Sequence, residues 1–210
     1  MKAKVTKKEL VTAFRTREIL DAARHLMESR GTEAVTMDEI AAGAGVAKGT
    51  IYLYFASKED LVYTLMSEVG ENILKDLTSV LETPDPPVQK LTRILALFLD
   101  YVERERFLFP IYARELPAKG QRGAGSRVRE LEEQILGRVT HLFTQGAAQG
   151  HFIAADPRLL TFLIRGLVLG VGHYQMAAGR PAREALPALS ALVFSGLINR
   201  SEALREVAKV

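Results

Sequence analysis

Apolar residues recur along the chain with the three-to-four-residue spacing of an α-helix, and strand-like alternation is almost absent. The first apolar stripe begins at Ile19 and ends before Gly31, a residue type that often terminates helices. Similar stripes predict further helices over about 36–44, 47–55, 58–82, 88–102, a short segment around 110, 126–149, 157–178 and 183–198. The sequence therefore predicts an all-α protein of about nine helices.

Several predicted helix starts carry capping signals. Thr36 is followed three residues later by Glu39, which is the arrangement of a capping box. Ser57 precedes a run of charged residues with acids suited to a first helical turn. Asp156 stands directly before a proline, a strong start signal, and Ser126 is expected to cap the helix that runs to about residue 149.

Two segments are rich in residues that interrupt helices. The segment 83–87 reads TPDPP and predicts a linker, and the segment 117–125 reads PAKGQRGAG and predicts a flexible loop. The order of the predicted helices indicates two domains. We expect a small N-terminal helical bundle over 1–57 and a larger helical domain over 58–210.

The composition excludes several classes of function. Among 210 residues, 48% are hydrophobic and 25% are charged, which is typical of a globular protein with a full core. The chain has no cysteine, so disulfides, thiolate nucleophiles and cysteine metal sites are excluded. Its four histidines stand apart, and no paired carboxylates, nucleophile motif or phosphate-binding loop accompany them. We expect neither a metal nor a cofactor, and no enzymatic activity.

Positive charge is concentrated at the N-terminus. The whole chain has a net charge of +3, whereas the first seventeen residues hold six basic residues against one acid. The basic residues of this arm are Lys2, Lys4, Lys7, Lys8, Arg15 and Arg17. The arm is either a solvated, frayed terminus or a segment that contacts phosphates.

No segment predicts a membrane protein. The N-terminus lacks the apolar run of a signal peptide. The most apolar stretch, 159–178, is interrupted by Arg165 and His173 and by glycines, so a buried helix explains it better than a membrane span. We expect a cytoplasmic protein without a membrane partner.

The segment 36–58 reads TMDEIAAGAGVAKGTIYLYFASK, and its two short predicted helices are joined by a glycine-containing turn. This is the arrangement of a helix-turn-helix motif. Ala41 is small where the helices must cross, and Gly45 can adopt a positive φ in the turn. The lysine, threonine and tyrosine side chains expected to face outward suit phosphates and base edges; they are Lys48, Thr50, Tyr52 and Tyr54. The alternative is a buried helical hairpin whose tyrosines belong to the core.

This part of the chain contains five short motifs: the run 31–36, IA at 40–41, AGV at 44–46, KGTIYLYF at 48–55 and SKE at 57–59. With them, the chain resembles the TetR family of transcriptional repressors over about residues 10–66. The resemblance implies a homodimer on a palindromic DNA operator and a small-molecule inducer in the C-terminal domain. The chain departs from the family pattern at Ala47, where serine or proline is common, and an alanine N-cap costs about 1 kcal/mol.

The resemblance also implies which residues contact DNA. They are Thr36, Lys48, Gly49, Thr50, Tyr52, Tyr54 and Lys58. Lys48, Thr50 and Tyr52 would face the major groove, with Lys48 and Tyr54 also near phosphates. Thr36 and Lys58, each at a helix start, would hold the DNA backbone.

Aromatic residues are concentrated after this segment and predict an apolar pocket for an effector, although such residues are also typical of a core. The candidates are Phe98, Tyr101, Phe107, Phe109, Tyr112, Phe143, Phe162 and Tyr174. Arg165 and His173, on an otherwise apolar helix, are candidates for the polar groups that orient a ligand. Both, like His141, are alternatively interface or satisfied core residues.

The last two predicted helices carry candidate dimer contacts. Gly166 and Gly170 permit close approach of another helix, and the final helix has an apolar stripe. That stripe comprises Leu186, Leu189, Val193 and Leu197. Packing within a single chain is the alternative.

Together these features predict a ligand-responsive repressor. A homodimer would bind a palindromic operator in double-stranded DNA and leave it when a small, hydrophobic molecule binds the C-terminal domain. Two other hypotheses remain open: a DNA-binding activator of the same fold, and an all-helical enzyme that uses the C-terminal cavity.

Overall fold

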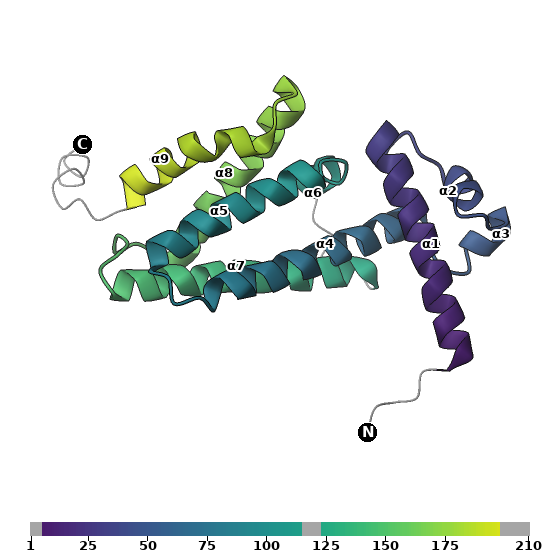
Figure 1. Cartoon of the computed structure of the whole chain (residues 1–210), viewed down its shortest axis with the longest axis horizontal. Helices are drawn as coiled ribbons and strands as arrows, with labels where there is room; N and C mark the ends of the chain where they lie inside the picture. The colour runs from purple at the N-terminus through teal and green to yellow at the C-terminus, as the bar shows by residue number, and fades with distance from the viewer. Residues whose placement is uncertain (1–5, 115–122, 198–210) are drawn as a thin grey trace. The chain divides into compact units, whose positions relative to one another are not determined.

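A computed structural model of the chain describes residues 6–114 and 123–197, and this part consists of helices and connecting turns without a β-strand (Figure 1). The helices are α1 (Lys7–Arg30), α2 (Met37–Gly43), α3 (Lys48–Ile51), α4 (Lys58–Leu81), α5 (Pro87–Arg104), α6 (Phe109–Arg114), α7 (Ala124–Ala148), α8 (Pro157–Ala178), the 3-10 helix η1 (Ala182–Ala185) and α9 (Leu186–Leu197). The prediction of an all-α fold with about nine helices is confirmed. Most of the predicted loop 117–125 lies outside the described residues.

The capping signals of the sequence hold at most helix starts. The Thr36 side chain accepts a hydrogen bond from the Glu39 backbone, and the Glu39 carboxylate accepts one from the Thr36 backbone, so the capping box is complete. Asp156 caps α8 through its carboxylate. Gly31 follows α1 with a φ of 82°, which only glycine adopts at low cost.

Two helix starts differ from the sequence prediction. The helix α7 begins two residues before Ser126, whose hydroxyl donates to the Gly123 carbonyl inside the first turn instead of capping it. The predicted helix 183–198 is divided into η1 and α9. Pro187 lies in the first turn of α9, where its missing N–H has no helical partner to lose.

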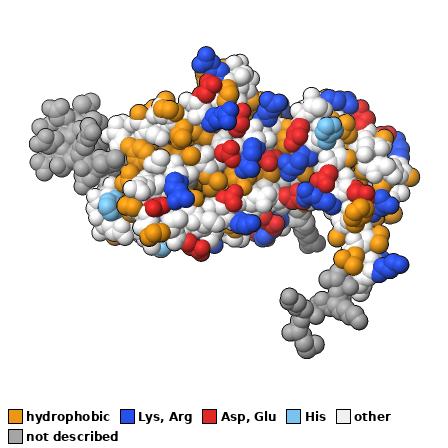
Figure 2. Space-filling model, viewed as in Figure 1, with side chains coloured by type: hydrophobic (Ala, Val, Ile, Leu, Met, Phe, Trp, Pro, Cys, Tyr) orange, Lys and Arg blue, Asp and Glu red, His pale blue; other side chains and the backbone are white. Residues whose placement is uncertain are grey.

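The helix α1 begins well before the apolar stripe that predicted it. A capping box between Thr6 and Glu9 fixes its start at Lys7, so Lys7 and Lys8 of the basic arm are helical. Its first three turns bury nothing and expose apolar side chains (Figure 2). These side chains are Leu10, Val11 and Phe14. The arm residues Lys2 and Lys4 lie outside the described residues.

The chain forms two compact units, whose described residues lie within 1–69 and 107–129 for the first unit and within 70–106 and 130–210 for the second. The first turns of α4 therefore belong to one unit and the remaining turns to the other. The segment 107–129, predicted in the C-terminal domain, is grouped with the first unit. Each unit has its own apolar core.

Long-range contacts anchor residues 107 and 108 in the first unit. Phe107 and Leu108 are buried in the same core as α1, α2 and the first half of α4. The buried Thr32 hydroxyl donates to the Phe107 carbonyl at 2.8 Å. The Arg24 guanidinium lies 5.5 Å from the centroid of the Phe107 ring and 4.0 Å from the Glu68 carboxylate. Segments far apart in the sequence thus share one core.

The second unit packs residues from α4, α5, α7, α8 and α9 around an aromatic pair. Phe143 and Phe152 are fully buried, with their ring centroids 5.4 Å apart. Gly146 makes room for them, because a Cβ at this position would collide with the Phe152 ring. At the edge of the core, the Tyr101 hydroxyl donates to Asp76 at 2.7 Å. Burial, reinforced by this bond, raises the pKa of Tyr101 to about 12.

One face of α8 remains outside the core of the second unit. Its inward face buries Leu160, Thr161, Ile164, Val168, Gly172 and Gln175. Its outward face exposes Leu159, Phe162, Leu163, Gly166, Gly170, Tyr174 and Met176. The expectation of a buried helix is therefore wrong for the single chain, since only 28% of the most apolar 18-residue stretch of α8 is buried. By length and composition alone the helix would also suit a membrane, a pattern that core helices share.

Candidate nucleic-acid interface

The segment from α2 to α3 forms two short helices around a tight turn in the first unit. Gly45 adopts a φ of 65° in the turn, and the Val46 N–H donates to the Ala41 carbonyl at 2.9 Å. Ile40 and Ile51 are fully buried, and Ala41 is 1% exposed between them. The buried side of both helices is therefore apolar and fixed, as a helix-turn-helix requires.

The structure brings the predicted DNA-contact residues to the opposite side. Lys48 and Gly49 are exposed on α3, and Tyr52, directly after it, is 48% exposed. Thr50 and Tyr54 are half-buried, and Tyr54 packs against the core of the first unit. Since Tyr52 is not a core residue, the alternative of a buried hairpin does not describe this segment.

The helix α3 is shorter than predicted. It ends at Ile51, whereas the sequence predicted a helix over 47–55. Ala47 gives it no side-chain cap, and Gly49 together with the β-branched Thr50 has low helix propensity. The backbone continues as a tighter turn, in which the Leu53 N–H donates to the Thr50 carbonyl at 3.1 Å. The turn presents Tyr52 and Leu53 side by side.

A charged contact joins α3 to α2 on the exposed side. The Lys48 ammonium donates to the Asp38 carboxylate of α2 at 2.5 Å. This hydrogen bond raises the pKa of Lys48, so its charge is maintained. DNA phosphates would have to compete with the Asp38 carboxylate for this cation. Because the Lys48 side chain is 72% exposed, such an ion pair is weak and readily exchanged.

Thr36 and Lys58 lie at helix starts beside this surface. The Thr36 hydroxyl is engaged with Glu39, which also receives a hydrogen bond from Arg30 at 2.8 Å. The Thr36 backbone N–H and these side-chain donors lower the pKa of Glu39 to about 2. The Lys58 ammonium donates to the Glu33 carbonyl at 3.2 Å and ties the start of α4 to the loop before α2. Their contacts to DNA stay predictions.

Sequence reasoning missed Leu53, which is 82% exposed directly beside Tyr52. A leucine at this position suits apolar contact with a thymine methyl group. It was read only as part of the motif, because leucine commonly belongs to a core. Asp38 was also missed as a partner of Lys48, since no local rule links positions ten residues apart.

The predicted effector residues are divided between the two compact units. Phe107, Phe109 and Tyr112 belong to the first unit. The others belong to the second unit: Phe98, Tyr101, Phe143, Phe162, Arg165, His173 and Tyr174. Phe98 and Phe143 contribute to its core, whereas Phe162, His173 and Tyr174 are exposed along α8. Arg165 pairs with the Glu132 carboxylate of α7 at 3.0 Å.

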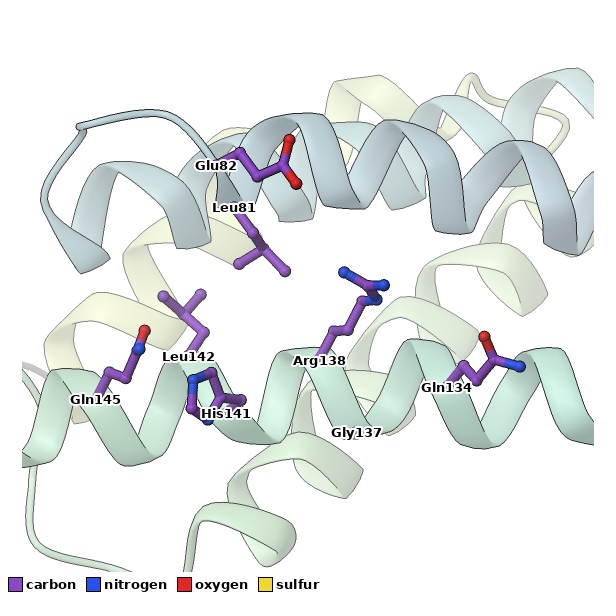
Figure 3. A pocket seen from close by; sticks show the side chains of 8 residues that line it. All are labelled: Leu81, Glu82, Gln134, Gly137, Arg138, His141, Leu142 and Gln145. Atoms are coloured by element: carbon purple, nitrogen blue, oxygen red, sulfur yellow. The ribbon is translucent and has the colours of Figure 1, made fainter.

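A groove in the second unit is lined by other residues. It has a volume of about 510 Å³ between the end of α4 and α7 (Figure 3). The lining residues are Leu81, Glu82, Gln134, Gly137, Arg138, His141, Leu142 and Gln145. Among these, the sequence pointed only to His141. The others lack a motif and meet only because one face of α7 lies against the end of α4.

The predicted interface residues divide into outward and inward sets. Gly166 and Gly170 are exposed on α8, with no atom within 4 Å of an added Cβ. Leu189 and Val193 are buried in the core of the second unit, and Leu186 packs against it. This matches the intramolecular alternative for α9. The side chain of Leu197 lies outside the described residues. On the outward side of α9, Leu192 is 64% exposed.

The described part of the chain is all-helical, and the exposed side of α3 lies opposite the buried side of the helix-turn-helix. These features define a DNA-binding protein of the helix-turn-helix class. Residues 19–64 match the family described as "Bacterial regulatory proteins, tetR family", and residues 84–197 match "Tetracyclin repressor-like, C-terminal domain". The chain belongs to the TetR family of DNA-binding transcriptional regulators.

Individual relatives are distant in sequence. The HTH-type transcriptional regulator YhgD of Bacillus subtilis is 26% identical over 157 residues, which cover 75% of this chain and 82% of the relative. The repressor KstR2 of Mycobacterium tuberculosis is 25% identical over 135 residues, covering 64% and 68%. The structure of Bacillus subtilis FadR in complex with stearoyl-CoA has a TM-score of 0.71 and 23% identity, covering 86% of this chain and 98% of that chain. At such identity, the structural likeness establishes the shared fold.

Proposed function

We propose that this regulator is a ligand-responsive repressor that binds a palindromic operator as a homodimer. The observation that carries the proposal is the exposure of Lys48, Gly49 and Tyr52 on and directly after α3, which is anchored by the buried Ile51. Lys48 and Tyr54 suit phosphates, and Thr50 and Tyr52 suit base edges in a major groove. Gly49 has open space around it, so the α3 backbone can approach DNA closely.

A second copy of the chain is the proposed partner for the outward faces of α8 and α9. Exposed leucines and aromatic side chains on one face are costly in water and typical of a permanent helical interface. Gly166 and Gly170 favour close helix packing there. A twofold dimer would present two α3 helices, and half-sites one DNA turn apart require a spacing of about 34–36 Å.

The proposed effector is a small molecule with a large apolar part, bound in the second unit. The relative with stearoyl-CoA supports the fatty acyl group as the class to test first. The helix α4 contributes residues to both units. An effector that shifts α4 would change the spacing of the two α3 helices, and a coupling free energy of about 1–3 kcal/mol would suffice.

The test is a fluorescence-anisotropy titration with DNA from upstream of the protein's own gene. We expect tight binding to one palindromic segment, weaker binding to a scrambled sequence of equal length, and release when an acyl-CoA thioester is added. Equal affinity for both DNA sequences would contradict the repressor hypothesis. Mapping the bound segment also separates repression from activation, because a repressor overlaps the polymerase site.

We propose no catalytic activity for the chain and a cytoplasmic location, where it would meet chromosomal DNA. The relatives above are named as regulators, which gives the enzyme hypothesis no support.

A further inference from the structure

The groove between the end of α4 and α7 combines an unpaired cation with flexible hydrogen-bonding groups. Figure 3 shows the Arg138 side chain rising from α7 into the space beside the end of α4. Within the described residues, no carboxylate lies within 4.0 Å of its guanidinium. Arg138 thus presents its donors to solvent, and a planar guanidinium is suited to bidentate pairing with phosphate or carboxylate.

The polar neighbours of Arg138 follow one face of α7. Gln134, His141 and Gln145 stand at helical spacing from it, and Glu82 faces them from the end of α4. Glutamine amides both donate and accept hydrogen bonds, and Glu82 accepts. The groove therefore suits a ligand that carries anionic groups together with amides or hydroxyls, rather than a simple anion.

The floor of the groove is apolar and continuous with the core of the second unit. Leu142 is 2% exposed and belongs to that core, and Leu81 packs against it. Figure 3 shows the two leucine side chains approaching each other between α4 and α7. A ligand with its polar head at Arg138 would therefore place its apolar part on these leucines.

Gly137 contributes to the shape of the groove. It lies inside α7 without an atom within 4 Å of an added Cβ, so packing within the chain does not require glycine. Glycine in a helix interior is about 1 kcal/mol less favourable than alanine. The other helical glycines with open surroundings include Gly49, proposed to meet DNA, and Gly166 and Gly170, proposed to meet a second copy. Gly137 keeps the groove floor free of a side chain.

We propose that this groove binds the phosphate- and amide-bearing head of an acyl-CoA thioester, with Arg138 pairing a phosphate and the start of the acyl chain on Leu81 and Leu142. The inference rests on the proposed function, which requires an effector with a large apolar part. The volume of about 510 Å³ falls within the range of small-molecule pockets, roughly 300–1,000 Å³.

The test is isothermal titration calorimetry of the full chain with short, medium and long saturated acyl-CoA thioesters, with CoA alone and with the free fatty acids. We expect Arg138→Gln to weaken acyl-CoA and CoA binding by roughly tenfold, the loss of one charge-assisted contact. Gly137→Leu fills the groove and should weaken acyl-CoA binding at least as much. Arg183→Gln, an exposed arginine that does not line the groove, is the matched control.

The outcomes separate the two proposals. If the unmodified protein binds acyl-CoA and releases its operator, but Arg138→Gln and Gly137→Leu bind as tightly as the unmodified chain, the groove is not the head site and the proposed function stands. If no acyl-CoA binds the unmodified protein, this effector class and the groove assignment both fail. Weakening by Arg183→Gln to the same extent would also overturn the inference, because it would indicate general charge attraction.

Discussion

Two exposed regions, one in each compact unit, differ in the side chains that they present to solvent. In the first unit, the exposed side of α3 and the turn after it presents Lys48, Gly49 and Tyr52, with Leu53 as an apolar neighbour. In the second unit, the outward sides of α8 and α9 are mainly apolar, with Phe162 and Leu192 outward. Both units have a complete apolar core of their own. The difference therefore lies in what each surface can meet.

A surface with polar groups keeps part of its hydration until it exchanges water for phosphates and bases, so its contacts can be reversible. An exposed apolar helix face is unfavourable in water at all times, so it suits a permanent partner. From this comparison we expect the regulator to use a transient interface in the first unit and a permanent one in the second. The following changes test that separation, from the largest expected effect to the smallest.

The largest effect is expected when Lys48 and Tyr52 are both replaced by alanine. Each contact with a base or phosphate contributes about 1–3 kcal/mol, so operator affinity should fall by roughly a hundredfold or more. Lys75→Ala removes an exposed lysine from the second-unit part of α4 and should leave affinity unchanged. Anisotropy titration measures both variants. Affinity of the double variant within a few fold of the unmodified protein would contradict the role of α3.

Introducing charge on the apolar face should separate the copies. Leu192→Glu places a carboxylate in the proposed dimer interface, where an unpaired buried charge costs several kcal/mol by order of magnitude. Analytical ultracentrifugation should therefore detect monomers. Leu53→Glu, at a still more exposed leucine of the first unit, is the matched control and should remain a dimer that has lost operator binding. A Leu192→Glu dimer of unchanged affinity would show that this face is not the interface.

A smaller effect, confined to the second unit, is expected for Gly146→Ala. The added Cβ collides with the buried Phe152 ring, and such overpacking typically costs about 1–3 kcal/mol of unfolding free energy. Gly137→Ala meets open space and should be neutral or stabilising by up to about 1 kcal/mol. Urea unfolding measures the pair. Equal stability of the two variants would indicate that the packing around Phe152 differs from the structure.

The smallest effect concerns acid stability of the first unit. Because hydrogen bonds from Thr36 and Arg30 lower the pKa of Glu39 from 4.5 to about 2, its carboxylate form stabilises the fold. That contribution is present above pH 4.5 and is lost as the pH falls toward 2. Glu39→Gln keeps a capping-box residue that does not titrate, so its Tm should fall less on acidification. A parallel decline of Tm in both proteins would show that Glu39 does not contribute.

The sequence predicted those features that depend on neighbouring residues. The capping box of Thr36, the αL turn at Gly45 and the cap at Asp156 are local chemistry and follow from residue type. The outward positions of Lys48 and Tyr52 followed from the helix-turn-helix spacing. Local chemistry therefore predicted most of the helices and the central residues of the candidate DNA site.

Features that depend on distant contacts could not be predicted in this way. The hydrogen bond from Thr32 to the Phe107 carbonyl joins positions 75 residues apart, so the grouping of Phe107 with the first unit had no local signal. Helical periodicity also cannot tell whether an apolar stripe meets its own core or a second copy. For that reason Leu189 was predicted outward, whereas the structure buries it and exposes Leu192.

The separation of a transient from a permanent interface is tested most directly by hydroxyl-radical labelling of the full chain, followed by mass spectrometry, with and without operator DNA. The account predicts that Tyr52 and Leu53 are labelled in the free protein and protected by DNA, whereas Phe162 and Leu192 are protected in both samples. Unchanged labelling of Tyr52 and Leu53 on DNA binding, or strong labelling of Phe162 and Leu192 in the free protein, would contradict it.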